Sequence, residues 1–431
     1  MVSLLKVVRA VTNPVFMGKA LAAGTQILVV LFAARVLAPD DANLLFSLLA
    51  LSAILTAVAS FGANGALVPF LYRHPDRILA ILGLLLGGKM LVSLLGAVMI
   101  AWLGYAQNLP PLLIAWTAFS SALLFVDFIA ESRGNADVDR ISRIKFVVFG
   151  AGILLKIVFF YLSFTVLLLT LYAEWLVIWL FYFLPVWRTM PGQRLPGLGD
   201  IALLGKFLAS SSWVWLSAVV SFGWTRAYFL ILTADIGVGP ANAYFVVVRL
   251  IEGFMLVPNT LAMRFFPDMV ARQQAEDEAG LTELRRQFLR RAMQAALAIA
   301  LAAPLMLAVL YGWGSGRPDH LVMSPLQALL VAFAAFVLIF RVALSREIIL
   351  TGFLALSIIS YLAGAIAGFS VYQLSGADDY EDALLGYAAF ALASFVGPFL
   401  ASPKRLHPFR HALFTILRPT PRASRKKGPS A

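Results

Sequence analysis

The sequence predicts an all-α polytopic membrane protein with twelve transmembrane helices, and three observations lead to this prediction. Hydrophobic residues make up 61% of the 431 residues and charged residues only 13%, whereas roughly 25% of the residues in a soluble domain are charged. Apolar runs of about 20 residues, each long enough to cross a ~30 Å hydrocarbon core as a helix, recur from residue 15 to residue 402. No loop between these runs is long enough to hold a soluble domain.

Charged or Pro- and Gly-rich breaks separate the predicted helices. The short SFT link at Ser163 predicts that the fifth and sixth helices form a hairpin. No signal-peptide pattern precedes the first helix, so we expect this helix to be retained. The twelve predicted helices span residues 15–37, 44–71, 78–103, 110–131, 146–163, 165–187, 203–232, 240–263, 290–311, 325–345, 353–374 and 383–401.

The distribution of basic residues predicts the orientation in the membrane. With the N-terminus inside, most of the 34 Lys and Arg residues lie in cytoplasmic loops or in the C-terminal tail, and the outer loop at residues 375–382 is purely acidic. This asymmetry follows the positive-inside rule and places both termini in the cytoplasm. The net charge of +12 then favours contact with anionic lipids of the inner leaflet, and no nucleic-acid partner is expected.

A Pro- and Gly-rich linker divides the chain into two halves of six helices. The predicted organisation is an N-terminal segment, an N-lobe, a linker, a C-lobe and a basic cytoplasmic tail, at residues 1–14, 15–187, 188–202, 203–402 and 403–431. A weak repeat relates the halves at the start of the second helix of each: Ala42, Asn43, Phe46, Leu51 and Val58 align with Ala241, Asn242, Phe245, Leu250 and Val257. Such a repeat predicts two pseudo-repeated lobes around a central cavity.

The composition excludes several kinds of chemistry. The chain has no cysteine, so disulfides and thiolate metal sites are absent. Its four histidines show no metal-ligand spacing, and we expect neither a metal nor another cofactor. The stretch GLLLGGKM at residues 83–90 matches part of a phosphate-binding loop but lies in mid-span and ends in Met90, so it reads as helix packing. The outer loops carry no catalytic set, and we therefore expect a protein that is not an enzyme.

The most informative residues are charged side chains at membrane depth, where a charge costs at least ~2.5 kcal/mol unless it faces a cavity or a partner. Lys19 can reach the inner surface by snorkelling. Arg249 and Glu252 are three residues apart and can pair, and Lys156 and Glu174 can pair across the hairpin. Two further acids, Asp127 and Glu131, either bind a coupling ion or lie at a solvated helix end.

Arg226 is the hardest of these charges to explain by pairing, because Asp235 is two to three turns away. Its helix also carries three tryptophans and the serine run at residues 210–212. Central cations outnumber central carboxylates, which favours an anionic ligand. We predict a cationic substrate-binding set of Arg226, Arg249, Lys19 and Lys89, with Glu252, Glu174, Lys156, Asp127 and Glu131 as candidates for ion pairs or ion coupling.

Two long stretches resemble a known family. Residues 18–71, with AAR at Ala33 to Arg35 and then FGANGAL, and residues 224–269, which end in FFPDM, resemble helices one, two, seven and eight of the bacterial polysaccharide flippases. These flippases belong to the multidrug/oligosaccharidyl-lipid/polysaccharide (MOP) exporter superfamily. The chain departs from the family pattern after Ala38-Pro39, where it has Ala42 and Asn43 in place of an aromatic–Gly pair. It also has Thr225 where the family often has an acidic residue.

The resemblance implies a multi-pass protein of the bacterial cytoplasmic (inner) membrane with a cavity lined mainly by helices one, two, seven and eight. The implied substrate is an undecaprenyl-pyrophosphate-linked oligosaccharide, flipped to the outer leaflet by alternating access for surface polysaccharide assembly, with other assembly proteins as partners. Four alternatives remain open. They are a drug or metabolite exporter of the same superfamily, a lipid II flippase, a membrane-embedded polysaccharide polymerase or ligase, and a membrane scaffold that transports nothing.

Overall fold

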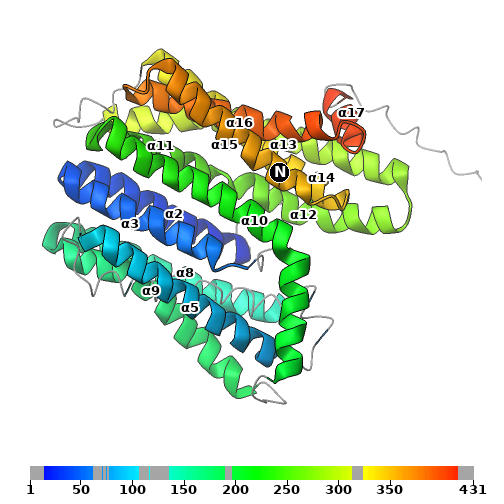
Figure 1. Ribbon diagram of the computed structural model, residues 1–431, viewed down its shortest axis with the longest axis horizontal. Coiled ribbons are helices and arrows are strands. Elements are labelled where there is room, and N and C mark those ends of the chain that lie inside the picture. The colour runs from blue at the N-terminus through cyan, green and yellow to red at the C-terminus, as the bar shows by residue number, and fades with distance from the viewer. Residues whose placement is uncertain are drawn as a thin grey trace, which may run out of the picture.

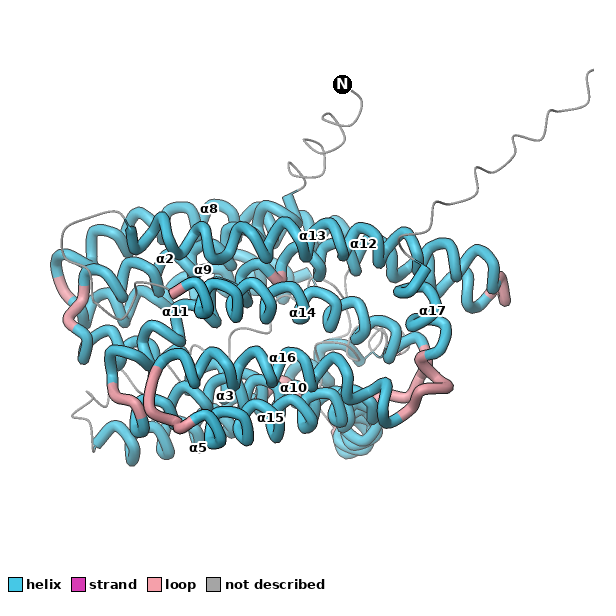
Figure 2. Tube along the Cα trace, turned by 90° about the horizontal axis from the view of Figure 1, so that it is seen from above, coloured by secondary structure: helices cyan, strands magenta, loops and turns pink. Residues whose placement is uncertain are grey.

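The computed structural model describes residues 14–61, 70, 74, 77–105, 116, 135–189, 197–312 and 324–415. Over these ranges the chain is helical and has no strand, which confirms the predicted all-α class. Within them, nine helical stretches are long and apolar enough to cross a membrane. Figure 2 shows these helices running along the long axis of the molecule, with the described connections gathered at its two ends.

The helices described in the first half overlap the predicted segments, but two predicted bounds are wrong, because α3 ends at Val58 and not near residue 71, and α8 begins at Asn135 and not near residue 146. Ser163 alone links α8 to α9, so the predicted hairpin is confirmed. Its carbonyl accepts a hydrogen bond from the Leu167 amide at 3.0 Å and so starts α9. The predicted helix at residues 110–131 lies outside the described residues except for Trp116. The helices are α2 (Pro14–Val36), α3 (Pro39–Val58), α5 (Ile78–Tyr105), α8 (Asn135–Leu162) and α9 (Phe164–Thr189).

In the second half, one predicted membrane crossing is broken into two helices at Met255. Pro258 explains the break, because it has no amide hydrogen to donate to the Phe254 carbonyl and its ring would clash with that carbonyl. The helices are α10 (Leu198–Asp235), α11 (Val238–Phe254), α12 (Leu256–Gln274), α13 (Glu278–Gly312), α14 (Pro325–Leu350), α15 (Ala355–Ser375), α16 (Tyr380–Ala401) and α17 (His407–Thr415).

Segments expected to be cytoplasmic loops or tail are partly helical. The sequence predicts a loop between residues 263 and 290, but α12 continues to Gln274 and α13 already begins at Glu278. Apolar residues at helical spacing lie among the charges of this segment, and four of them are buried in the core: Met269, Leu281, Phe288 and Leu289. Because the segment carries many charged residues, it was predicted as a loop although its apolar residues follow the spacing of an amphipathic helix. In the same way, α17 folds within the predicted tail and buries Phe409 and Ala412.

A buried ion pair fastens α13 to α14. Arg285 donates to Glu347 through Nε, at 3.0 Å from Oε2, and through Nη2, at 2.6 Å from Oε1. Both side chains are less than a tenth exposed. Arg285 falls in the segment predicted as a cytoplasmic loop between residues 263 and 290, and the early start of α13 at Glu278 brings it inside the bundle.

The core consists of two hydrophobic clusters, and α10 contributes to both. A larger hydrophobic cluster is built mainly from α2, α3 and α10 to α17, and a smaller one from α5, α8, α9 and the first part of α10. Figure 1 shows α10 as a bent helix that runs from beside α5 up to α11. In its first half Trp215 Nε1 donates to the Val58 carbonyl at 2.8 Å, and Arg77 pairs with Asp200 at 3.3 Å. Its second half packs against α11 and α15.

The predicted ion pair between Lys156 and Glu174 is present, with Nζ 2.6 Å from Oε2, and both side chains are buried. Gly152, one turn from Lys156 on α8, makes room for this pair, because a Cβ at Gly152 would overlap the Glu174 carboxylate.

We expect Gly152→Ala to displace the Glu174 carboxylate and to lower the free energy of unfolding by about 3–5 kcal/mol, the usual cost of breaking a buried pair. Gly150→Ala is the matched control, since a Cβ there lies 3.7 Å from Leu21 in ordinary contact. The control should be neutral or stabilising by about 0.5–1 kcal/mol through helix propensity. Thermal unfolding of the purified protein in detergent checks both values. Equal stability of the two variants would show that Gly152 has no such role.

Candidate functional site

A cavity of about 440 Å³ lies between α2, α10, α11, α12 and the helices α14 to α16. Its charged lining consists of three arginines and one glutamate, so the described wall carries a net charge of +2. These residues, Arg226, Arg249, Arg341 and Glu252, define what we term the arginine cavity. The rest of the wall is mixed, with aromatic side chains such as Tyr361 and Tyr387 and polar ones such as Gln26.

Glu252 binds two of the arginines through the same carboxylate oxygen. Its Oε2 lies 2.5 Å from Nη2 of Arg226 on α10 and 3.3 Å from Nη1 of Arg249, one turn earlier on α11. Phe245 supports both cations, because its ring centroid lies 5.9 Å from the Arg226 guanidinium carbon and 5.1 Å from that of Arg249. The sequence predicted the Arg249–Glu252 pair but not the contact between Arg226 and Glu252.

Arg226 is the most deeply buried residue of this group, and Glu252 is the most exposed to the cavity. The Arg226 side chain is only 1% exposed, compared with 15% for Arg249 and 28% for Glu252. Among the described residues, Nε and Nη1 of Arg226 have no hydrogen-bond partner. A buried donor without a partner costs about 1–3 kcal/mol. The group therefore retains hydrogen-bonding capacity for an oxyanion, and the planar guanidinium is the side chain best matched to phosphate oxygens.

Arg341 is the cavity residue that the sequence analysis missed. Its guanidinium carbon lies 3.6 Å from the centroid of the Tyr361 ring. The predicted helix at residues 325–345 ends four residues after Arg341, whereas α14 continues to Leu350 and so carries Arg341 further into the bundle. Ser345, four residues later, lines the same cavity. This spacing of polar residues within an apolar helix is the signal that could have identified it.

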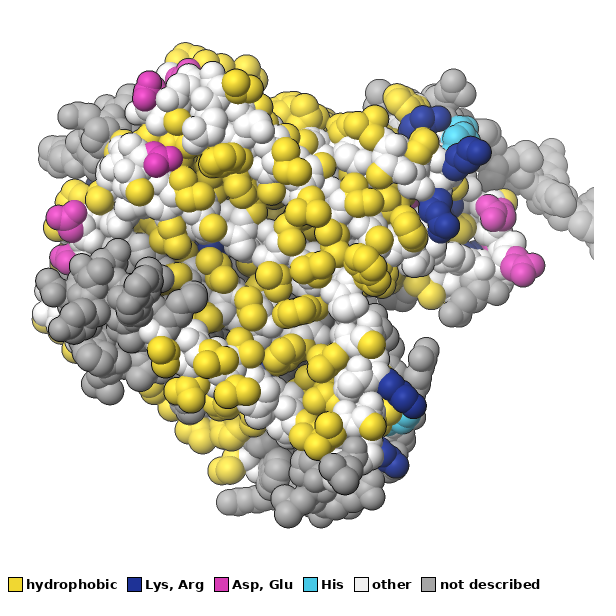
Figure 3. All heavy atoms as spheres, in the orientation of Figure 1, with side chains coloured by type: hydrophobic (Ala, Val, Ile, Leu, Met, Phe, Trp, Pro, Cys, Tyr) yellow, Lys and Arg dark blue, Asp and Glu magenta, His cyan; other side chains and the backbone are white. Residues whose placement is uncertain are grey.

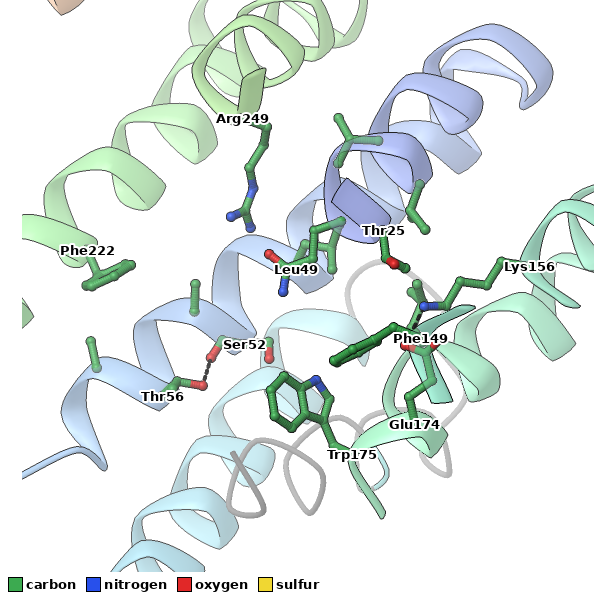
Figure 4. Close-up of a pocket in the computed structure, with 16 residues that line it drawn as sticks. Thr25, Leu49, Ser52, Thr56, Phe149, Lys156, Glu174, Trp175, Phe222 and Arg249 are labelled. Carbon is green, nitrogen blue, oxygen red and sulfur yellow. Dashed lines mark hydrogen bonds and ion pairs between the residues drawn. The ribbon is translucent and has the colours of Figure 1, made fainter. Parts of the chain in front are cut away.

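A second cavity of about 250 Å³ adjoins the first and lies mainly between α2, α3, α8 and α9. The two cavities share Gln26, Phe222 and Arg249. Figure 4 shows Trp175 and Phe149 projecting toward Ser52 of α3, the Lys156–Glu174 pair on the same side, and Arg249 entering from α11. We term this second space the tryptophan cavity.

Of the remaining predicted site residues, one is described and lies away from both cavities, and the others fall outside the described side chains. Lys89 is buried on α5, at 4% exposure, and lines neither cavity. Lys19 belongs to α2, but its side chain lies outside the described part of the structure, as do Asp127 and Glu131. Within the described ranges, no three His, Asp or Glu side chains come together in a way that could hold a metal ion.

Equivalent residues of the predicted repeat contact each other between α3 and α11. Asn43 Nδ2 donates to Asn242 Oδ1 at 3.1 Å, and Asn242 in turn donates to the Pro39 carbonyl at 2.9 Å. The rings of Phe46 and Phe245 stack with their centroids 4.7 Å apart. Contact of a residue with its own equivalent is what a two-fold axis between them produces. We refer to these four side chains as the Asn–Phe contact.

The Asn–Phe contact lies toward the acidic end of the molecule. This end carries Asp40, Asp41, Asp235 and the acidic residues at 378–382. Figure 3 shows acidic side chains at this end, a belt of hydrophobic side chains in the middle, and most of the visible Lys and Arg at the opposite end, where the outline is notched. The belt agrees with a surface that faces lipid, with many exposed leucines such as Leu94 and Leu301.

No protein-family model matches the chain, and no curated protein sequence matches it. Solved transporter structures do share its fold. A Vibrio cholerae MATE transporter aligns over 95% of this chain and 99% of its own, with a TM-score of 0.63 and 13% identity. An inward-facing multidrug resistance MATE family transporter of the MOP superfamily aligns over 91% and 96%, with a TM-score of 0.63 and 14% identity. The lipid II flippase MurJ, in an inward closed conformation, aligns over 94% and 90%, with a TM-score of 0.65 and 11% identity.

Proposed function

We propose that this chain, which has the fold of the MATE transporters and of MurJ, flips an undecaprenyl-pyrophosphate-linked oligosaccharide from the inner to the outer leaflet of the bacterial cytoplasmic membrane. The observation that carries the proposal is the arginine cavity, in which three arginines oppose a single glutamate. A net positive cavity among apolar helices is costly without an anionic ligand. The pyrophosphate of a lipid-linked sugar supplies the oxygens that guanidinium groups bind best.

In the proposed orientation the acidic end faces outward, so the Asn–Phe contact closes the cavity on the outer side. The headgroup then enters from the inner leaflet, the contact between α3 and α11 separates, and the headgroup leaves at the outer face. This is alternating access between two halves of the molecule. The similar fold of MurJ, which is named a lipid II flippase, supports the proposal that this chain also transports a lipid-linked substrate.

Within this scheme the Glu252 carboxylate takes the place of the substrate's anionic group while no substrate is bound. It neutralises part of the charge on Arg226 and Arg249, which keeps two cations tolerable at membrane depth. The headgroup first meets Arg249 and Arg341 and then competes with Glu252 for Arg226. Arg226 is thus proposed as an inner contact of the bound headgroup, because it is only 1% exposed in the present state.

A drug exporter is the second candidate, because several structures of similar fold are MATE transporters and one is named a multidrug resistance transporter. A cationic drug would need an acidic wall, and the excess of arginines in the cavity opposes this.

The proposal of a flippase includes contact of the basic end with anionic lipids and cooperation with other polysaccharide assembly proteins.

Reconstitution in liposomes tests the proposal. We expect the protein to move a fluorescent undecaprenyl-pyrophosphate oligosaccharide between leaflets. The double variant Arg249→Ala, Arg341→Ala should slow this movement about tenfold or more, since each lost charged hydrogen bond weakens binding. Arg410→Ala, a basic residue exposed on α17, is the matched control and should keep full activity. Movement of a cationic dye without movement of the lipid-linked sugar would overturn the proposal in favour of a drug exporter.

A further inference from the structure

We infer that the tryptophan cavity is a binding site for the sugar that follows the pyrophosphate, and that this sugar is neutral. The inference rests on the proposed function, since it places the phosphates in the arginine cavity. The two cavities share Gln26, Phe222 and Arg249. A headgroup whose phosphates bind Arg249 therefore extends past this junction into the tryptophan cavity.

The charge of the tryptophan cavity suits a neutral ligand. Lys156 and Glu174 are the charged residues of its described wall apart from Arg249 at the junction, and they neutralise each other at 2.6 Å. The pair is buried, so neither charge is available to a ligand without breaking it. A cavity of this kind recognises its ligand through neutral polar groups and aromatic surface.

The polar groups of the wall are placed to accept hydrogen bonds from sugar hydroxyls. The Thr25 hydroxyl donates a hydrogen bond to the Leu21 carbonyl at 2.8 Å, and the Thr56 hydroxyl donates one to the Ser52 carbonyl at the same distance. A hydroxyl that donates in this way still has acceptor capacity. Gln26 is exposed in the structure and lines both cavities, and its amide can donate as well as accept.

Trp175 provides the aromatic surface. The indole and the Phe149 ring meet in a T-shaped contact, with ring centroids 5.5 Å apart at 75°, and the Lys145 ammonium lies over one face of the indole, 5.2 Å from a ring centroid. These contacts from α8 hold the indole in place, and Figure 4 shows it beside Ser52 in the cavity. An indole combines a large flat apolar face with one polar N–H. This combination suits the apolar C–H face and the hydroxyl groups of a sugar ring.

Binding of two lipid probes to the purified protein tests the inference. The first probe is undecaprenyl pyrophosphate, and the second carries one N-acetylhexosamine on the same lipid. We expect the wild-type protein to bind the second probe about tenfold more tightly, as one stacked ring allows. Trp175→Ala should abolish this preference without changing the affinity for the first probe, and Trp175→Phe should keep part of it. Trp213→Ala, which removes a tryptophan that is 51% exposed, is the control and should behave as wild type.

The outcomes separate this inference from the proposed function. If the wild-type protein binds both probes equally, or if Trp175→Ala weakens both equally or neither, the sugar site is overturned and the proposed function stands. If the wild-type protein binds neither probe, the proposed function itself fails. Ser52→Ala, on α3 beside the indole, gives a second measure of the sugar preference if Trp175→Ala does not fold.

Discussion

Joining Asn43 to Asn242 is expected to stop transport. The double variant Asn43→Cys, Asn242→Cys, oxidised to a disulfide or bridged by a short bis-methanethiosulfonate, should lose translocation of the lipid-linked sugar to the level of empty liposomes. Reduction should restore it. The physical reason is that the two side chains hold α3 against α11 at 3.1 Å, and alternating access requires this contact to separate. The chain has no native cysteine, so the introduced pair is the only thiol chemistry present.

Two controls make this result specific to the Asn–Phe contact. Each single cysteine variant should transport normally after oxidation. A pair placed within one hairpin, Ser360→Cys with Ser394→Cys, joins α15 to α16, where the Ser360 hydroxyl contacts the Ser394 carbonyl. Linking this pair should leave transport unchanged, because both helices move together. Full transport by a completely bridged Asn43–Asn242 pair would contradict the proposed closure.

Glu252→Gln is expected to reduce stability far more than Arg226→Gln. The first variant leaves the Arg226 guanidinium, at 1% exposure, without its counter-charge, and stranding a buried charge costs about 3–5 kcal/mol. The second variant leaves Glu252 at 28% exposure and still paired with Arg249 at 3.3 Å, so only about 1 kcal/mol should be lost. Thermal unfolding in detergent measures the difference.

The double variant Arg226→Gln, Glu252→Gln separates stability from transport. It should recover most of the stability that Glu252→Gln loses, because no buried charge is left without a counter-charge. It should nevertheless transport as slowly as Arg226→Gln, because both variants lack the guanidinium proposed to contact the headgroup. Glu283→Gln is the matched control, since it breaks the partly exposed Arg286 pair at 3.3 Å and should cost less than about 1 kcal/mol. If the two single variants prove equally stable, Glu252 is not the counter-charge of Arg226.

The sequence predicted pairs well where both partners lie on one helix or one hairpin. Arg249 and Glu252 are three residues apart, and Lys156 and Glu174 lie at similar depth on α8 and α9, so local geometry alone brought each pair within reach. The sequence could not predict the pair of Arg226 with Glu252 or that of Arg285 with Glu347, because each depends on how separate helices pack.

The membrane-spanning, all-helical class of this protein followed from the sequence alone. A helix in lipid satisfies every backbone polar group within its own segment, so the length of each apolar run is enough to predict it. The internal repeat also identified Asn43 and Asn242 as equivalent residues, although not as neighbours. Only the tertiary structure decided which charges share a cavity. It showed Arg226 buried and paired with Glu252, and it placed Arg341 in the same cavity. Depth in the membrane can be read along one helix, whereas the direction in which a side chain points is set by the helices packed around it.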